Sequence, residues 1–168
     1  MSDQPMSGQP ADDRPGAAAG PSAVVRMPVV RLDPGLDLPR TARVGDAGLD
    51  LCAVADVELA PAGGRAVVGT GLAVAIPFGC CGLILPRSGL ARSHGVTLLN
   101  TPGLIDAGYR GELQVLLLNT DPDHAYTVRR GDRVAQLVIM AFTAVQLEVV
   151  DALDDSERGT GGWGHSGR

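Results

Sequence analysis

Hydrophobic and polar residues alternate in short stretches along most of this 168-residue chain. The stretches are rich in β-branched residues, and turn sequences such as DPG, PAGG, DPD and RRGD separate them. Alternation with a period of two, interrupted by Gly, Pro and Asp, is typical of β-strands joined by tight turns. We therefore expect strands in residues 24–32, 49–59, 65–76, 81–85, 96–99, 112–118, 125–128, 134–142 and 145–150.

Helical periodicity is almost absent from the chain. The best candidate is a single short turn after Pro86, where the Ser88 side chain is expected to cap residues 89–92. Many short strands at regular spacing, with one short helix, predict an all-β domain built as a barrel or a jelly roll.

The two ends of the chain differ from the middle in composition. Residues 1–23 are rich in Pro, Gly, Ser and Asp and offer little to bury, which predicts a disordered N-terminal tail. Residues 24–150 are the expected β domain, since 168 residues suffice for one core and hardly for two. Residues 151–168 are expected to be a flexible, Gly-rich C-terminal arm, which by composition is either a frayed end or a segment that cradles a ligand.

Charge, hydropathy and cysteine content narrow the functional classes. The net charge of −5 argues against a nucleic-acid binder, which normally has a basic face. No run of 18 apolar residues and no basic stretch followed by an apolar core is present, so we expect neither a membrane span nor a secretory signal. Cys52, Cys80 and Cys81 favour buried thiols in a reducing cytoplasm over a disulfide or a metal site.

Two stretches near the middle of the chain carry candidate chemistry. AGLDL places the carboxylate of Asp50 at the entry to a strand, where it is either a hydrogen-bonding turn residue or part of a site. PRSGLA places Arg87, the Ser88 hydroxyl and the Gly89 N–H at the start of a helix. Such a start favours anions by geometry and dipole, although a capped turn can have the same sequence.

Three further stretches follow. GLIDAGYRGEL reads as a hairpin with Asp106 and Tyr109 three residues apart, although an ordinary Asp-Gly turn is equally compatible. RGDRVAQLVI starts a strand in which Gln136 is either a core amide or a ligand contact. RGTGGWGHSG combines Arg158, several glycines and the single tryptophan, Trp163, a set able to hold phosphate oxygens and cover a base.

In this order and spacing, the five stretches resemble the five motifs of the trimeric deoxyuridine triphosphatases, or dUTPases. The resemblance covers residues 24–167. It implies the β-clip fold of that family, a distorted jelly-roll barrel, and a homotrimer with shared active sites. It also implies hydrolysis of dUTP to dUMP and pyrophosphate, which keeps uracil out of DNA and supplies dUMP for thymidylate synthesis.

The resemblance assigns roles around the phosphates. Asp106 is expected to orient and deprotonate the water that attacks the α-phosphorus. Asp50 is expected near the phosphates without acting as the base. Mg²⁺ is expected on the phosphate oxygens, without direct protein ligands. The expected phosphate contacts are Arg87, Ser88, Gly89 and Gln136.

The resemblance also assigns the base and sugar pockets. The hairpin between Asn100 and Tyr109 is expected to select uracil, and Tyr109 to exclude a 2′-hydroxyl. Further expected wall residues are Gly103, Leu104, Ile105 and Gln114.

On the C-terminal arm, Arg158 and Ser166 are expected to contact the γ-phosphate when the arm closes over the nucleotide. Trp163 stands where the family usually has a stacking phenylalanine, and His165 where a serine is common. Which of these two rings covers the base is left open.

Other functions are compatible with parts of this pattern. A dCTP deaminase, or its bifunctional relative, shares the fold but uses a different catalytic glutamate and lacks the Gly-rich arm. A nucleotide-sensing homologue would bind dUTP through the same motifs without hydrolysing it. A purely structural trimer would not need five polar motifs.

Overall fold

The computed structural model describes residues 24–161. Within them the chain forms ten strands and one short helix, which confirms the all-β prediction. In chain order the elements are β1 (Val29–Arg31), β2 (Leu49–Cys52), β3 (Val57–Leu59), β4 (Arg65–Val74), β5 (Cys80–Leu85), α1 (Ser88–His94), β6 (Val96–Leu98), β7 (Gly103–Ile105), β8 (Glu112–Asn119), β9 (Tyr126–Val128) and β10 (Arg133–Ala141).

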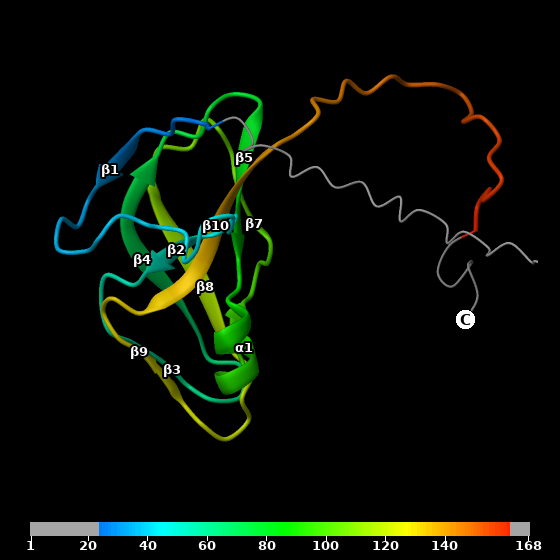
Figure 1. Cartoon of the computed structure of the whole chain (residues 1–168). Coiled ribbons are helices and arrows are strands. Elements are labelled where there is room, and N and C mark those ends of the chain that lie inside the picture. Colours follow the sequence, from blue (N-terminus) through cyan, green and yellow to red (C-terminus); the bar gives the residue numbers. More distant parts are fainter. Residues whose placement is uncertain (1–23, 162–168) are drawn as a thin grey trace, which may run out of the picture.

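The strands form two four-stranded sheets and a small ribbon (Figure 1). One sheet has the order β1-β4-β8-β6 and the other the order β2-β10-β5-β7, while β3 pairs with β9. Neighbouring strands in the sheets run antiparallel. Because strands adjacent in a sheet are far apart in the sequence, residues from distant motifs meet on its surface.

The core lies between the inward faces of the two sheets. On β8, Leu113, Val115 and Leu117 are buried at every second position, as strand alternation requires. Leu51 of β2 and Leu137 of β10 are also almost completely buried. Burying a side chain of this kind stabilises a fold by about 1.5–3 kcal/mol, so the sheets give rigid support to what lies at their ends.

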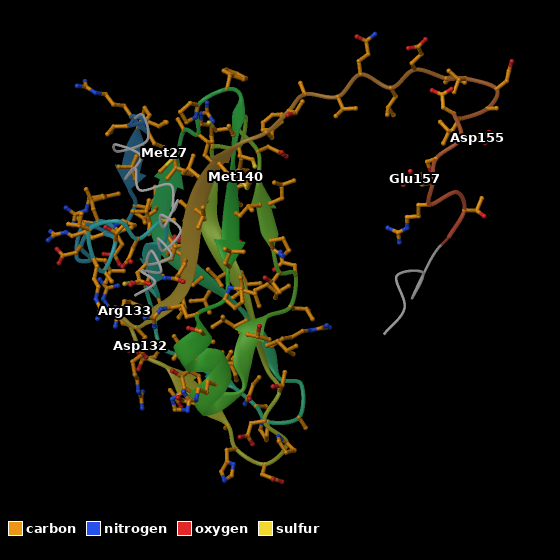
Figure 2. The ribbon with its side chains drawn as sticks, turned by 45° about the vertical axis from the view of Figure 1, so that its right-hand side comes forward. Met27, Asp132, Arg133, Met140, Asp155 and Glu157 are labelled. Carbon is orange, nitrogen blue, oxygen red and sulfur yellow. The ribbon has the colours of Figure 1, made fainter. Side chains whose placement is uncertain are left out.

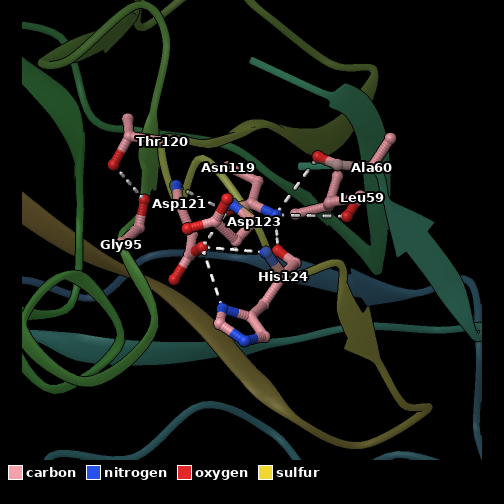
Figure 3. Close-up of polar contacts among 8 residues, drawn as sticks. All are labelled: Leu59, Ala60, Gly95, Asn119, Thr120, Asp121, Asp123 and His124. Carbon is pink, nitrogen blue, oxygen red and sulfur yellow. Dashed lines mark hydrogen bonds and ion pairs between the residues drawn. The ribbon is translucent and has the colours of Figure 1, made fainter. Parts of the chain in front are cut away.

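Asn119 at the end of β8 binds three neighbouring segments together (Figure 3). Its fully buried side chain donates from Nδ2 to the carbonyl oxygens of Leu59, Ala60 and His124, at 3.2, 3.1 and 2.9 Å. Its Oδ1 accepts from the Asp121 N–H at 3.0 Å. Both the donor and the acceptor end of the amide are used, which fixes β3 against the β8–β9 loop.

The short helix differs from the expectation at its start. α1 begins at Ser88, and Arg87 is its N-cap, with extended backbone angles and no side-chain cap. The prediction that Ser88 caps the helix is therefore wrong. The helix ends at His94, and its C-cap Gly95 has a positive φ of 63°, which suits a residue without a Cβ. No helix in residues 24–161 is long and apolar enough to span a bilayer.

The last expected strand, residues 145–150, is not formed. After Ala141 the chain leaves the sheets and extends away from them (Figure 1). Val145, Leu147 and Val149 are 77, 88 and 98% exposed. The alternating pattern is present, but a strand also needs a partner, and no strand of the same chain pairs with this segment in the described structure. The predictions for residues 1–23 lie outside the described part of the chain.

Candidate active site

Three central strands of one sheet place Asp50, Gln136 and Arg87 close together. Asp50 of β2 lies directly opposite Gln136 of β10, and Gln136 lies opposite Leu85 of β5 on its other side. Arg87 follows Leu85 by two residues, at the point where β5 gives way to α1. Residues of the first, second and fourth motifs therefore meet at Asp50.

Asp50 is the centre of this cluster. Its carboxylate is buried, with 8% of the residue exposed. Oδ1 accepts from Arg87 Nε at 3.2 Å and, at a longer 3.4 Å, from Gln136 Nε2. Oδ2 accepts from Arg133 Nη1 at 3.1 Å, and Arg87 Nη1 donates to the Arg133 carbonyl at 3.1 Å. We call Asp50, Arg87, Arg133 and Gln136 the Asp50 cluster.

The Asp50 cluster has a positive charge excess, since two guanidinium groups face one carboxylate. The Arg87 side chain is 23% exposed and that of Arg133 is 54% exposed, so both keep donors for a bound group. Guanidinium groups with free donors bind phosphate oxygens well. Ser88 and Gly89 follow directly at the start of α1.

Arg133, which is labelled in Figure 2, belongs to the Asp50 cluster but was not among the residues predicted from the sequence. Regular alternation would place residues 133 and 136 on opposite faces of a strand. The register of β10 against β2 is irregular between Arg133 and Ala135, which changes this parity. The one sequence feature that could have indicated a role for Arg133 is its position close to Gln136 in the chain.

Gly48, in the first motif, makes room for the amide of Gln136. A Cβ at Gly48 would lie 3.2 Å from Gln136 Nε2 and 3.3 Å from its Cδ. That is tight for non-bonded heavy atoms, whose optimal separation is about 3.5–4.0 Å. The glycine therefore lets Gln136 approach Asp50.

The third motif forms a separate group beside β5. Its strand, β7, pairs with β5, and Asp106 follows directly after it. The Tyr109 N–H donates to the Asp106 carbonyl at 3.0 Å, which closes a turn. Arg110 Nη1 donates to the carbonyls of Ala107 and Tyr109, both at 2.7 Å. The exposed Asp106 carboxylate thus sits on a turn with a fixed main chain.

The start of the same hairpin brings Asn100 close to Gly103. Asn100 is exposed, Gly103 is buried, and a Cβ at Gly103 would lie 3.5 Å from Asn100 Nδ2. Leu104 is 61% exposed and Ile105 is half-buried. The Thr101–Pro102 peptide bond is cis.

The Asp50 cluster and the Asp106 turn are far apart within one chain. Ile105 lies opposite Gly82 of β5, and Arg87 lies five residues beyond Gly82. At about 3.3 Å per residue, this separation is roughly 16 Å along the strand. One chain therefore does not bring Asp106 to the phosphate-binding candidates.

The remaining predicted site residues lie elsewhere. Gln114 is exposed on β8 of the other sheet, opposite Gly69, and the structure does not place it with either group. Arg158 lies on the segment that leaves the sheets, which also carries Asp155 and Glu157 (Figure 2), and its Nε donates to the Gly161 carbonyl at 3.0 Å. The last three predicted residues, Trp163, His165 and Ser166, lie outside the described part of the chain.

The cysteine nearest to the site is a free thiol. Cys52 lies opposite Arg133 in the β2–β10 register, and no disulfide is formed by Cys52, Cys80 or Cys81. Burial, reinforced by the negative charge of Asp50, raises the pKa of the Cys52 thiol above its ordinary value. The thiol therefore stays protonated at neutral pH and is a poor nucleophile.

The dUTPase family model matches residues 35–167 of this chain. The chain belongs to the dUTPase family.

Relatives in sequence agree with this membership. A protein named deoxyuridine 5′-triphosphate nucleotidohydrolase from Rhodococcus erythropolis is 56% identical over 137 residues, which cover 82% of this chain and 83% of that protein. A protein of the same name from Mycobacterium tuberculosis strain ATCC 25177 / H37Ra is 53% identical, with 84% of this chain and 94% of that protein covered.

Solved structures also agree with membership of the dUTPase family. The dUTPase of Staphylococcus bacteriophage 80alpha, solved with dUPNHPP, matches with a TM-score of 0.79 and 30% identity over 86% of this chain and 100% of its own. A mutant dUTPase of phage phi11 of S. aureus, described with a structural Mg(II) ion, matches with a TM-score of 0.71 and 27% identity over 78% and 100% of the two chains. The expected jelly-roll-like fold of the family is confirmed.

Proposed function

We propose that this protein hydrolyses dUTP to dUMP and pyrophosphate. The Asp50 cluster is the observation that carries the proposal, because it joins three motifs into a partly buried, positively charged group suited to phosphate oxygens. The names of the relatives from Rhodococcus erythropolis and Mycobacterium tuberculosis support the same activity. The product dUMP would feed thymidylate synthesis, and removal of dUTP would keep uracil out of DNA.

Asp106 is the proposed base. Its carboxylate would orient a water molecule towards the α-phosphorus and accept a proton from it. Exposure of Asp106 on a turn held by Arg110 supports this role, since a base must reach the reacting water in a fixed position. Arg87, Ser88, Gly89 and Gln136 would hold the phosphates, because phosphoryl transfer depends mainly on positioning and on charge neutralisation.

Asp50 fits a supporting role, since its oxygens already accept from two guanidinium groups and one amide. A cation at this carboxylate would meet Arg87 and Arg133, so the donors present suit an ion that arrives on the substrate phosphates. When bound, Mg²⁺ would neutralise phosphate charge and hold the triphosphate in a reactive geometry.

We further propose a homotrimer in which neighbouring chains complete each site. The roughly 16 Å along β5 between the Asp106 turn and Arg87 supports this assembly, because one chain lacks a complete set in one place. The exposed apolar side chains of residues 145–150 support a segment that finds its partner on another chain. Residues 151–168 would then form the closing arm, with Arg158 and Ser166 on the γ-phosphate and Trp163 or His165 on the base.

Selectivity among nucleotide substrates would come from the hairpin between Asn100 and Tyr109. Its main chain and the Asn100 amide would pair with the uracil edge, and Gly103, Leu104, Ile105 and Gln114 would line the pocket. A cytosine would leave buried polar groups unpaired, which is costly. Tyr109 would pack beneath the deoxyribose and reject UTP. We place this activity in the cytoplasm, with no nucleic acid or membrane as partner.

Pyrophosphate release from dUTP, dTTP, dCTP and UTP in the presence of Mg²⁺ tests the proposal. Release from dUTP alone is the expected result. Ammonia release from dCTP would instead favour a deaminase. No release from any nucleotide, combined with a change in Trp163 fluorescence on adding dUTP, would replace the enzyme with a nucleotide sensor.

A further inference from the structure

We propose that Gly111 is a positioning residue for sugar selection, because its missing Cβ leaves the space that the Tyr109 ring occupies. This inference rests on the proposed function, in which Tyr109 forms the floor beneath the deoxyribose. It adds a residue whose role is to hold that floor in place.

The outer end of the Tyr109 ring lies over Gly111. A Cβ built on Gly111 would lie 2.4 Å from the Tyr109 hydroxyl oxygen, 2.7 Å from Cζ and 3.1 Å from Cε2. Attractive contacts between non-bonded carbon atoms occur at about 3.5–4.0 Å. An alanine side chain and the observed ring therefore cannot occupy these positions together.

The backbone of Gly111 does not itself require glycine. Its φ lies outside the left-handed region that excludes side chains, unlike that of Gly131, where φ is 88°. Apart from the two residues adjacent in the chain, the three nearest neighbours of the added Cβ all belong to the Tyr109 side chain. The need for glycine therefore comes from the ring and not from the turn.

The ring is oriented at the same end by a hydrogen bond. The Tyr109 hydroxyl donates to the Glu112 carbonyl at 2.9 Å, so the ring folds back over Gly111 to reach β8. Tyr109 is 43% exposed, so part of the residue is accessible to a ligand. A methyl group at Gly111 would push the hydroxyl away from Glu112 and tilt the exposed side.

Displacement of the Tyr109 ring should change how the site recognises the sugar, and should leave recognition of the base and the phosphates unchanged. A misplacement of about 1 Å can cost about 100-fold in a precisely positioned site. We therefore expect Gly111→Ala to lower the ratio of kcat/KM for dUTP over UTP by about 10-fold to 100-fold.

The test is a double-mutant cycle between Gly111→Ala and Tyr109→Ala. The selectivity ratio is measured for the wild type, both single variants and the double variant. If Gly111 acts through the ring, Gly111→Ala lowers the ratio in the wild type and has no further effect in the Tyr109→Ala background. An equal loss in both backgrounds would overturn the proposal, as would an unchanged ratio in the Gly111→Ala single variant.

Gly108→Ala is a matched control for the selectivity ratio, since it adds the same methyl group to the same hairpin, where the new Cβ would have no atom within 4 Å outside the two adjacent residues. Crystal structures of the wild type and Gly111→Ala test the steric step independently of activity. A Tyr109 ring that stays in place in the variant would overturn the inference even if the protein proves not to hydrolyse dUTP. A wild type without turnover would by itself refute only the proposed function.

Discussion

Replacing Asp50 by Asn should weaken both the fold and substrate binding. The substitution keeps the shape of the side chain and removes its charge. It therefore leaves the guanidinium groups of Arg87 and Arg133 close together without the carboxylate that faces both of them. The new amide group would also place N–H donors towards groups that only donate.

The size of the stability loss depends on how exposed the two arginine partners of Asp50 are. Breaking a fully buried ion pair costs about 3–5 kcal/mol. Here Asp50 is buried, but the Arg87 side chain is 23% exposed and that of Arg133 is 54% exposed, so water replaces part of the lost interaction. We expect a loss of about 1–3 kcal/mol, in the range for hydrogen bonds to charged groups. For a domain of this size, the loss corresponds to a fall in Tm of about 3–10 °C.

Urea unfolding and calorimetry at one fixed protein concentration measure the loss, and steady-state kinetics measure KM for dUTP. KM should rise because Arg87 and Gln136 lose the group that orients them. Asp56→Asn is the matched control, since it removes the carboxylate that binds the exposed Arg129, and it should have a much smaller effect on unfolding. Unchanged unfolding and unchanged KM in Asp50→Asn would show that the cluster does not hold the site together.

Three further outcomes can be checked. Asp106→Asn should abolish hydrolysis in a pyrophosphate-release assay while calorimetry still detects dUTP binding; retained turnover would remove Asp106 as the base. Deletion of residues 158–168 should sharply reduce turnover while sedimentation shows an unchanged oligomer, and full activity would contradict a closing arm. The backbone N–H groups of Asp123 and His124 lower the pKa of the Asp121 carboxyl, so its stabilising effect is complete above the unfolded value of about 3.9 and is lost as the pH falls through the lower folded value. Urea unfolding between pH 6 and pH 2 should therefore show a weaker acid dependence in Asp121→Asn, and an identical dependence would refute this contribution.

The strand pattern was predictable because it depends on local alternation. The expected stretch 112–118 corresponds to β8, whose buried leucines and valine recur at every second residue. The same rule failed at residues 145–150, where alternation is present and no strand forms within the chain. A single sequence specifies which face of a segment is apolar, but not whether the surface that covers it belongs to the same chain.

The candidate site was predictable as a set of motifs and not as a geometry. The motif order indicated Asp50, Arg87 and Gln136, but not that Asp50 would accept hydrogen bonds from two arginines at once. That arrangement depends on the pairing of β2, β10 and β5, which are distant in the chain. The separation of Asp106 from Arg87 also depends on register, since it follows from the pairing of β7 with one end of β5.

The register irregularity in β10 makes the pairing pattern of this strand a functional property. Arg133 and Gln136 reach the same carboxylate only because the pairing shifts between Arg133 and Ala135. Regular pairing of the same residues at the same chain length would turn Arg133 to the face opposite Gln136 and away from Asp50, although every side chain would be unchanged. Protein engineers who vary this stretch should therefore preserve the pairing irregularity before Gln136 as strictly as the identity of Gln136 itself.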